Sequence, residues 1–166
     1  YWNTDNQLKQ IDNWQPNCWI QVTCPTDEDR RYLEDTYQIP DYFFSDIADN
    51  DERARYEYDD GWMLIILRIP YVKEVRSRTP HTTIPLGIIL KKGICITVCN
   101  HETNMMIDFV SYQQKRNMGF TDSVDLVFRL FLSPFQINRC QITHLPSHRQ
   151  KRNLSQFLQK IDFRLR

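Results

Sequence analysis

The sequence contains no apolar run long enough to cross a lipid bilayer. Its longest uninterrupted apolar run is six residues, 62–67, and Arg68 ends it, whereas a transmembrane helix needs about 20 apolar residues. No basic segment followed by an apolar segment and a small-residue cleavage site is visible, so we expect no targeting signal. The chain starts at Tyr1 rather than at a methionine, which we interpret as the sign of a fragment or a processed chain.

The motifs that define common enzyme classes are also absent. The chain has four glycines, too few for a glycine-rich loop that would surround a phosphate, and it contains no GxSxG, HExxH or CxxC motif. We therefore predict that the protein is not an enzyme. A hydrolase that uses only carboxylates needs no such motif and stays open as an alternative.

The cysteines and histidines do not form a predicted metal site. Both close cysteine pairs are too widely spaced along a strand to share one zinc ion as neighbours, about 13 and 20 Å apart; the five cysteines are Cys18, Cys24, Cys95, Cys99 and Cys140. We expect them to be small buried hydrophobic side chains in a reducing compartment. His144 and His148 have helical spacing, but Pro146 lies between them and disfavours the helix.

Charge is segregated along a chain whose net charge is zero. Residues 1–70 carry 15 Asp/Glu against 6 Lys/Arg, a net charge of −9, and residues 71–166 carry the reverse, +9. The acidic residues are densest at 41–60, with eight Asp/Glu and two Arg. The halves could attract each other, face different partners, or only be solvated. The basic residues from 149 onward lack clustered aromatics that would stack bases, so we expect no nucleic-acid partner.

The composition, with 41% apolar and 25% charged residues, indicates one globular domain. Thr26 is a predicted helix cap, and we expect the following helix to turn Leu33 and Tyr37 inward and the next helix, from Asp41, to bury Phe43, Phe44 and Ile47. Ser133-Pro134 should end the last helix. The predicted elements are strand 18–24, helix 26–38, a helix from 41, edge strand 53–58, buried strand 62–69, a basic loop 71–81, strands 82–90 and 94–99, and helices 104–115 and 122–132. This order favours the α/β (α+β) class, with a mixed β-sheet sandwiched between helices.

Several segments together resemble a known family. They are a strand with a tryptophan (19–22), a helix ending at 37–40, the segment Phe-Phe-Ser-Asp-Ile at 43–47, the strand Tyr-Glu-Tyr-Asp-Asp at 56–60, and the apolar strands at 63–68, 84–90 and 94–98. In order and spacing they are similar to the N-terminal cytoplasmic domain of CorA-type magnesium transporters. The resemblance covers residues 18–132, and we treat 1–132 as the CorA-like domain. Residues 133–166 do not match and would be the start of the stalk or a divergent tail.

The resemblance implies a function in transport. The family forms homopentamers that pass Mg²⁺, also Co²⁺, through the inner membrane, and its cytoplasmic domains sense divalent cations between protomers. One regulatory ligand of the family is an aspartate that corresponds to Asp46, while Ser45 stands where the family has a glutamate. Its usual partner lies on the stalk of a neighbouring chain. The pore signature Gly-Met-Asn and both membrane helices are missing from the sequence, so contact with the membrane would be through helices outside it.

The acidic residues themselves are consistent with such a role. Mg²⁺ is a hard cation that keeps much of its water and takes one or two carboxylates. An acidic surface segment containing Asp46, Asp49, Asp51 and Glu52 suits a weak site of this kind, and we take Asp46 and Asp49 as the candidate metal ligands. The alternative for these acids is that they solvate a loop and cap a helix. The alternative for the whole chain is a stand-alone protein-interaction domain that retains the fold without transport.

Overall fold

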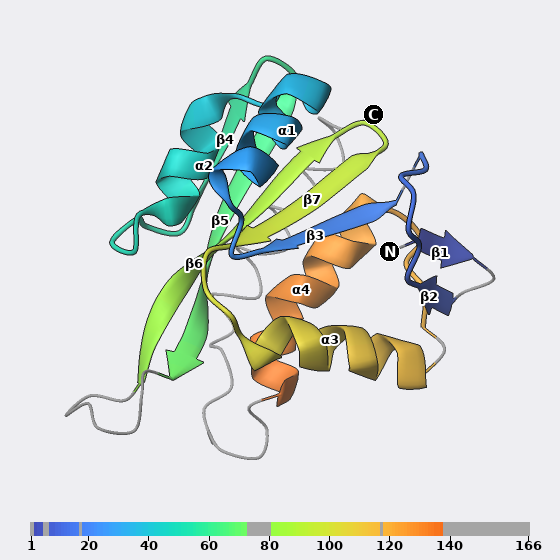
Figure 1. Cartoon of the computed structure of the whole chain (residues 1–166). Coiled ribbons are helices and arrows are strands. Elements are labelled where there is room, and N and C mark those ends of the chain that lie inside the picture. Colours follow the sequence, from blue (N-terminus) through green and yellow to red (C-terminus); the bar gives the residue numbers. More distant parts are fainter. Residues whose placement is uncertain (1, 5–6, 17, 73–80, 117, 138–166) are drawn as a thin grey trace. The chain divides into compact units, whose positions relative to one another are not determined.

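The computed structural model describes residues 2–4, 7–16, 18–72, 81–116 and 118–137. They form two compact units, residues 18–103 and residues 2–16 together with 104–137 (Figure 1). Within the described ranges, no helix combines the length and the apolar character that a membrane crossing requires. Most of the expected basic loop, at 73–80, and the segment 138–166 with Cys140, His144 and His148 lie outside the described residues.

A five-stranded mixed sheet is the centre of the first unit. Its strand order is β3-β7-β6-β5-β4, in which β3 runs parallel to β7 and the other neighbours are antiparallel. The strands are β3 (Trp19–Thr23), β4 (Arg55–Asp59), β5 (Trp62–Val72), β6 (His81–Lys91) and β7 (Ile94–Cys99). The predicted α/β class with a mixed sheet is confirmed, and β4 is the edge strand that its alternating sequence predicted.

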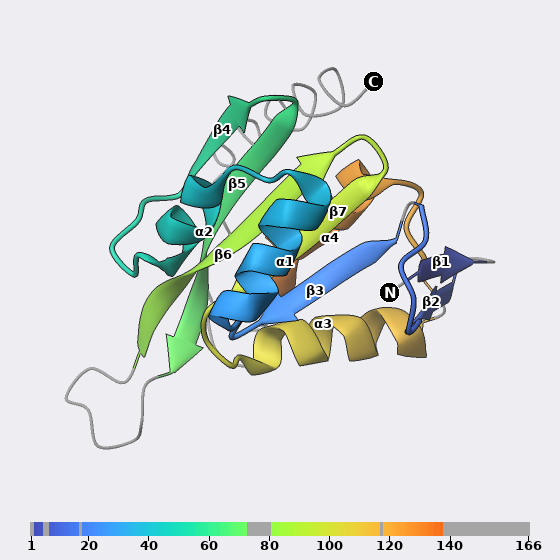
Figure 2. The same ribbon diagram turned by 45° about the horizontal axis from the view of Figure 1, so that its top comes forward.

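Two helices, α1 (Asp27–Tyr37) and α2 (Asp41–Ala48), cover one face of this sheet (Figures 1 and 2). The predicted Thr26 cap is confirmed, because its hydroxyl accepts the N–H of Asp29 and the Asp29 carboxylate accepts the N–H of Thr26. The Thr26 hydroxyl also donates to Asp29 Oδ2, and this bond, followed by the one from the Thr26 N–H, lowers the pKa of Asp29. The helices and the sheet share a hydrophobic core made of Leu33, Ile39, Phe43, Phe44, Ile47, Trp62, Leu64, Ile66, Ile89, Ile96 and Val98. The predicted inward residues are therefore confirmed, with Tyr37 packed at the edge of this core.

The cysteines of the described residues are all free thiols. Cys18, Cys95 and Cys99 are buried, as the sequence predicts, whereas Cys24 is exposed. Cys24 follows β3 in a left-handed backbone conformation, with φ of 49°, where the chain turns away from the sheet. Burial raises the pKa of the Cys95 thiol to about 12, so this side chain stays a neutral apolar group at physiological pH.

The second unit contains the hairpin β1 (Trp2–Thr4) and β2 (Gln7–Lys9) and the helices α3 (Asn104–Lys115) and α4 (Ser123–Ile137). Arg129 of α4 pairs with Asp125 and donates to Gln113 of α3, which is buried. The predicted end of the last helix at residue 132 is wrong, because α4 continues through Ser133 and Pro134 to Ile137. A proline inside a helix removes one hydrogen bond and strains the preceding turn, and α4 tolerates this cost.

A close approach between Gly87 and Ile47 sets the distance of α2 from the sheet. A Cβ atom at Gly87 of β6 would lie 2.2 Å from Cδ1 and 2.4 Å from Cγ1 of Ile47. Ile47 is 1% exposed and belongs to the hydrophobic core. The Ile47 side chain therefore has no room to move away, and only a glycine at position 87 lets α2 reach this position.

We expect Gly87→Ala to destabilise the protein by about 1–3 kcal/mol, the usual cost of overpacking a core. In urea unfolding, the double variant Gly87→Ala/Ile47→Ala should lose less stability than the sum of the two single variants, because Ile47→Ala removes the clashing atoms. Strictly additive losses would contradict this account of the contact.

Candidate functional site

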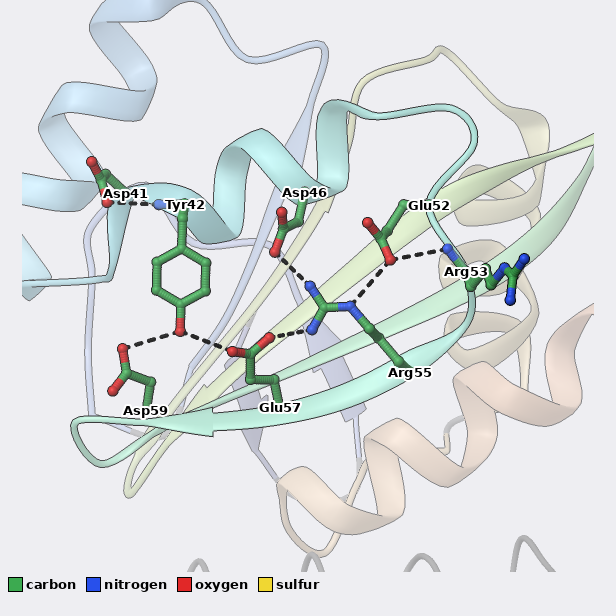
Figure 3. A network of polar contacts seen from close by, with 8 residues as sticks. All are labelled: Asp41, Tyr42, Asp46, Glu52, Arg53, Arg55, Glu57 and Asp59. Atoms are coloured by element: carbon green, nitrogen blue, oxygen red, sulfur yellow. Dashed lines mark hydrogen bonds and ion pairs between the residues drawn. The ribbon is translucent and has the colours of Figure 1, made fainter.

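The acidic segment predicted from the sequence folds into α2, the loop 49–54 and the edge strand β4. Tyr42 and Asp46 are one helical turn apart and lie on the same side of α2. Arg55, Glu57 and Asp59 alternate along β4 and therefore point to the same face of the strand. Figure 3 shows that these two rows of side chains face each other. The arrangement brings polar groups from a helix, a loop and a strand into one network.

Arg55 is the centre of this network. Its Nη2 donates to Asp46 Oδ2 at 2.6 Å, its Nε donates to Glu52 Oε1 at 3.1 Å, and its Nη1 donates to Glu57 Oε2. Donation to Glu57 is the main reason that the pKa of Arg55 is raised above its ordinary value. The side chains of Arg55 and Asp46 are 32% and 26% exposed, so the pair lies at the surface but is partly shielded from water.

Tyr42 connects α2 to the last residues of β4. Its hydroxyl lies 3.0 Å from Asp59 Oδ2 and 3.3 Å from Glu57 Oε1. The single O–H proton of Tyr42 is shared between these two carboxylates, and neither carboxylate can donate when ionised. Desolvation, followed by hydrogen bonding to Asp59, raises the pKa of the Tyr42 phenol. Four carboxylates therefore share one guanidinium and one phenol, which leaves an excess of negative charge at this surface.

The loop after α2 is held by its own contacts. Asp49 Oδ1 accepts the N–H of Asp51 at 2.9 Å. Arg68 of β5 donates through Nη1 to the carbonyl oxygens of Asn50 and Glu52, at 2.6 and 3.1 Å. His101 Nε2 lies 2.9 Å from Asn50 Oδ1. The loop is thus held by Arg68 through two backbone carbonyl groups and by His101 through the Asn50 side chain.

The structure places the predicted ligands in different surroundings. Asp46 is bound by Arg55, whereas Asp49 and Asp51 are exposed at the surface of the loop. Among the described residues, no group of three or more His, Cys, Asp or Glu side chains is arranged to hold a metal ion. A cage made only of protein ligands is therefore absent from this part of the chain. A hydrated Mg²⁺ needs only one or two carboxylates, and Asp46 and Asp49 therefore stay the predicted ligands.

The sequence reasoning did not single out Arg55 and Tyr42. The signal for them was present, because Arg55 begins the alternating strand and Tyr42 precedes Asp46 by one helical turn. What the sequence did not supply was the packing of α2 next to β4, which turns these two periodicities into one contact surface.

A comparison with protein families finds a match to the model described as "CorA-like Mg2+ transporter protein" over residues 14–151. No curated protein matches the sequence. Among solved structures, the chain is similar to the complete CorA magnesium transporter from Methanocaldococcus jannaschii, with 22% identity, a TM-score of 0.62, and coverage of 78% of this chain and 40% of that chain.

Two structures of single domains are also similar. The soluble domain of the same transporter matches with 22% identity and a TM-score of 0.57, covering 89% of this chain and 54% of that chain. The ZntB cytoplasmic domain from Vibrio parahaemolyticus matches with 19% identity and a TM-score of 0.58, covering 73% of this chain and 48% of that chain. These likenesses support the fold, and the chain spans about half the length of the structures that it matches.

The Tyr42 hydrogen bonds give a test of the network. We expect Tyr42→Phe to lower the free energy of unfolding by about 1 kcal/mol at pH 8, the usual contribution of a partly exposed hydrogen bond. Because the pKa of Tyr42 is raised in the folded state, its stabilisation is present below the unfolded value of about 10 and is lost as the pH rises above it. In urea unfolding, the difference in the free energy of unfolding between wild type and Tyr42→Phe should be smaller at pH 11 than at pH 8.

Tyr32→Phe is the control, since Tyr32 is 63% exposed. Its stability should follow that of wild type at both pH values. If Tyr42→Phe also follows wild type at both pH values, the Tyr42 hydroxyl does not stabilise the protein through these hydrogen bonds.

Proposed function

Because the chain belongs to the CorA-like Mg²⁺ transporter family, we propose that it is the regulatory, divalent-cation-sensing part of a Mg²⁺ or Co²⁺ transporter. The family is one of transporters and not of enzymes. In this proposal the chain lies at the cytoplasmic face of the membrane, within a longer protein that assembles as a homopentamer and carries its pore in other segments. The cation is both the regulatory ligand and the transported ion.

The observation that carries the proposal is the excess of carboxylates at the surface of α2 and β4. Asp46 occupies the position that resembles the family's regulatory aspartate, and it forms one network with three further carboxylates and a single guanidinium as counter-charge. Such a surface attracts cations. Asp46 and Asp49 are the proposed ligands, at the last turn of α2 and directly after it.

The proposed mechanism is electrostatic. Carboxylates that approach each other from adjacent protomers repel when no cation is present, and a bound divalent ion offsets that repulsion. Loss of the ion would then loosen the assembly, because the ion binds one arrangement of the protomers better than the other. A weak site suits this role, since a sensor must release its ion when the cation concentration falls.

The proposal predicts that millimolar Mg²⁺ stabilises the chain through Asp46. At ten times its dissociation constant a ligand adds about 1.4 kcal/mol, which raises the melting temperature of a chain of this size by roughly 3–5 °C. The melts are recorded with and without MgCl₂ at matched ionic strength, together with mass by light scattering. We expect Asp46→Asn to reduce the shift and any Mg²⁺-dependent gain in mass.

Asp35→Asn is the matched control, because Asp35 is an exposed carboxylate on the neighbouring helix α1 and its replacement removes the same charge. This variant should keep the wild-type response. An unchanged response in Asp46→Asn would exclude Asp46 as a ligand.

The segregated charge favours a second candidate, a stand-alone interaction domain that self-associates through its oppositely charged halves. In that case the mass in light scattering should fall with added NaCl, since salt screens such contacts. The mass should also be the same in MgCl₂ and in NaCl of equal ionic strength.

A further inference from the structure

The Asp46 carboxylate already accepts a hydrogen bond from the Arg55 guanidinium. Its Nη2 lies 2.6 Å from Asp46 Oδ2, while Nε and Nη1 of the same group donate to Glu52 and Glu57. These acceptors come from α2, the loop and β4, so the guanidinium is held from three directions (Figure 3). Arg55 is therefore fixed with one positive charge directed at the proposed cation ligand.

A divalent cation and this guanidinium compete for the same carboxylate. A cation bound directly at Oδ2 would replace the Nη2 contact, and a hydrated cation beside Asp46 would be repelled by the positive charge of Arg55. The Arg55–Asp46 pair is partly exposed, with 32% and 26% of the two side chains open to solvent. Ion pairs of this kind contribute little to stability, so a cation can displace the contact.

We propose that Arg55 is an internal competitor for the divalent cation at Asp46 and that it sets how weakly the cation binds. This inference rests on the proposed function. When the cation binds, Arg55 releases Asp46 and keeps its contacts with Glu52 and Glu57. Cation binding at Asp46 is therefore coupled to the attachment of α2 to β4, and the same coupling lowers the affinity for the cation.

The test compares Arg55→Met with Arg53→Met in the 166-residue chain, using calorimetric titration with MgCl₂ at constant ionic strength. Arg53 is exposed, and its guanidinium points away from the carboxylates (Figure 3), so both variants remove the same charge from neighbouring positions. We expect Arg55→Met to bind Mg²⁺ about tenfold more tightly than wild type, equivalent to about 1.4 kcal/mol. Arg53→Met should change the affinity less than about twofold, because an exposed charge is screened by salt.

A third variant tests whether the gain in Mg²⁺ affinity depends on the Asp46 carboxylate. Arg55→Met combined with Asp46→Asn should lose the increased affinity. Equal affinities of wild type and Arg55→Met, or equal gains in the two arginine variants, would overturn the inference and leave the proposed function standing. Mg²⁺ binding by Arg55→Met through Asp46, with none by wild type, would support internal competition and refute sensing by the native chain.

A measurement on the unaltered protein covers the case in which Arg55→Met does not fold. The side-chain Nε–Hε signal of Arg55 in an NMR spectrum should shift as MgCl₂ is added, because the guanidinium loses one acceptor. The corresponding signals of Arg53 and Arg68 should stay in place. A signal of Arg55 that does not move while Mg²⁺ binds would overturn the inference.

Discussion

The position of α2 depends on the contact between Ile47 and Gly87. Because β6 has no side chain at residue 87, Ile47 enters the core and α2 lies close against the sheet. Asp46 is the residue before Ile47, and the same contact therefore places its carboxylate over the edge of the sheet, where Arg55 binds it. An apolar packing constraint thus determines which polar groups meet.

The polar network reduces the repulsion among the acidic side chains of residues 41–60. Residues 41–60 carry eight acidic side chains, and like charges at short distances oppose folding. Arg55 binds three of these carboxylates, and the one hydroxyl proton of Tyr42 is shared between Asp59 and Glu57. Arg68 donates to backbone carbonyl groups of the loop. The network offsets part of the repulsion on this face and leaves the face with a net negative charge.

Much of this fold could be predicted from the sequence, because its signals are local. The apolar spacing of Phe43, Phe44 and Ile47 defines one helix face, and the alternation of residues 53–58 predicted the edge strand that lies at Arg55–Asp59. The contact between Arg55 and Asp46 could not be predicted in this way, since it depends on how α2 packs beside β4. The sequence predicted that the last helix ends at residue 132, because the local preference of proline is to end a helix. In the structure, α4 continues past Pro134 to Ile137.

The central claim is that a divalent cation binds at Asp46 on this network. The most direct measurement adds Mn²⁺, which broadens NMR signals near its binding site, to the ¹⁵N-labelled chain and to its Asp46→Asn variant. The account predicts that broadening concentrates on the backbone signals of Asp46, Asp49 and their neighbours, and that it is weakened in the variant. Broadening that is centred elsewhere, or that is the same in both proteins, would contradict the account.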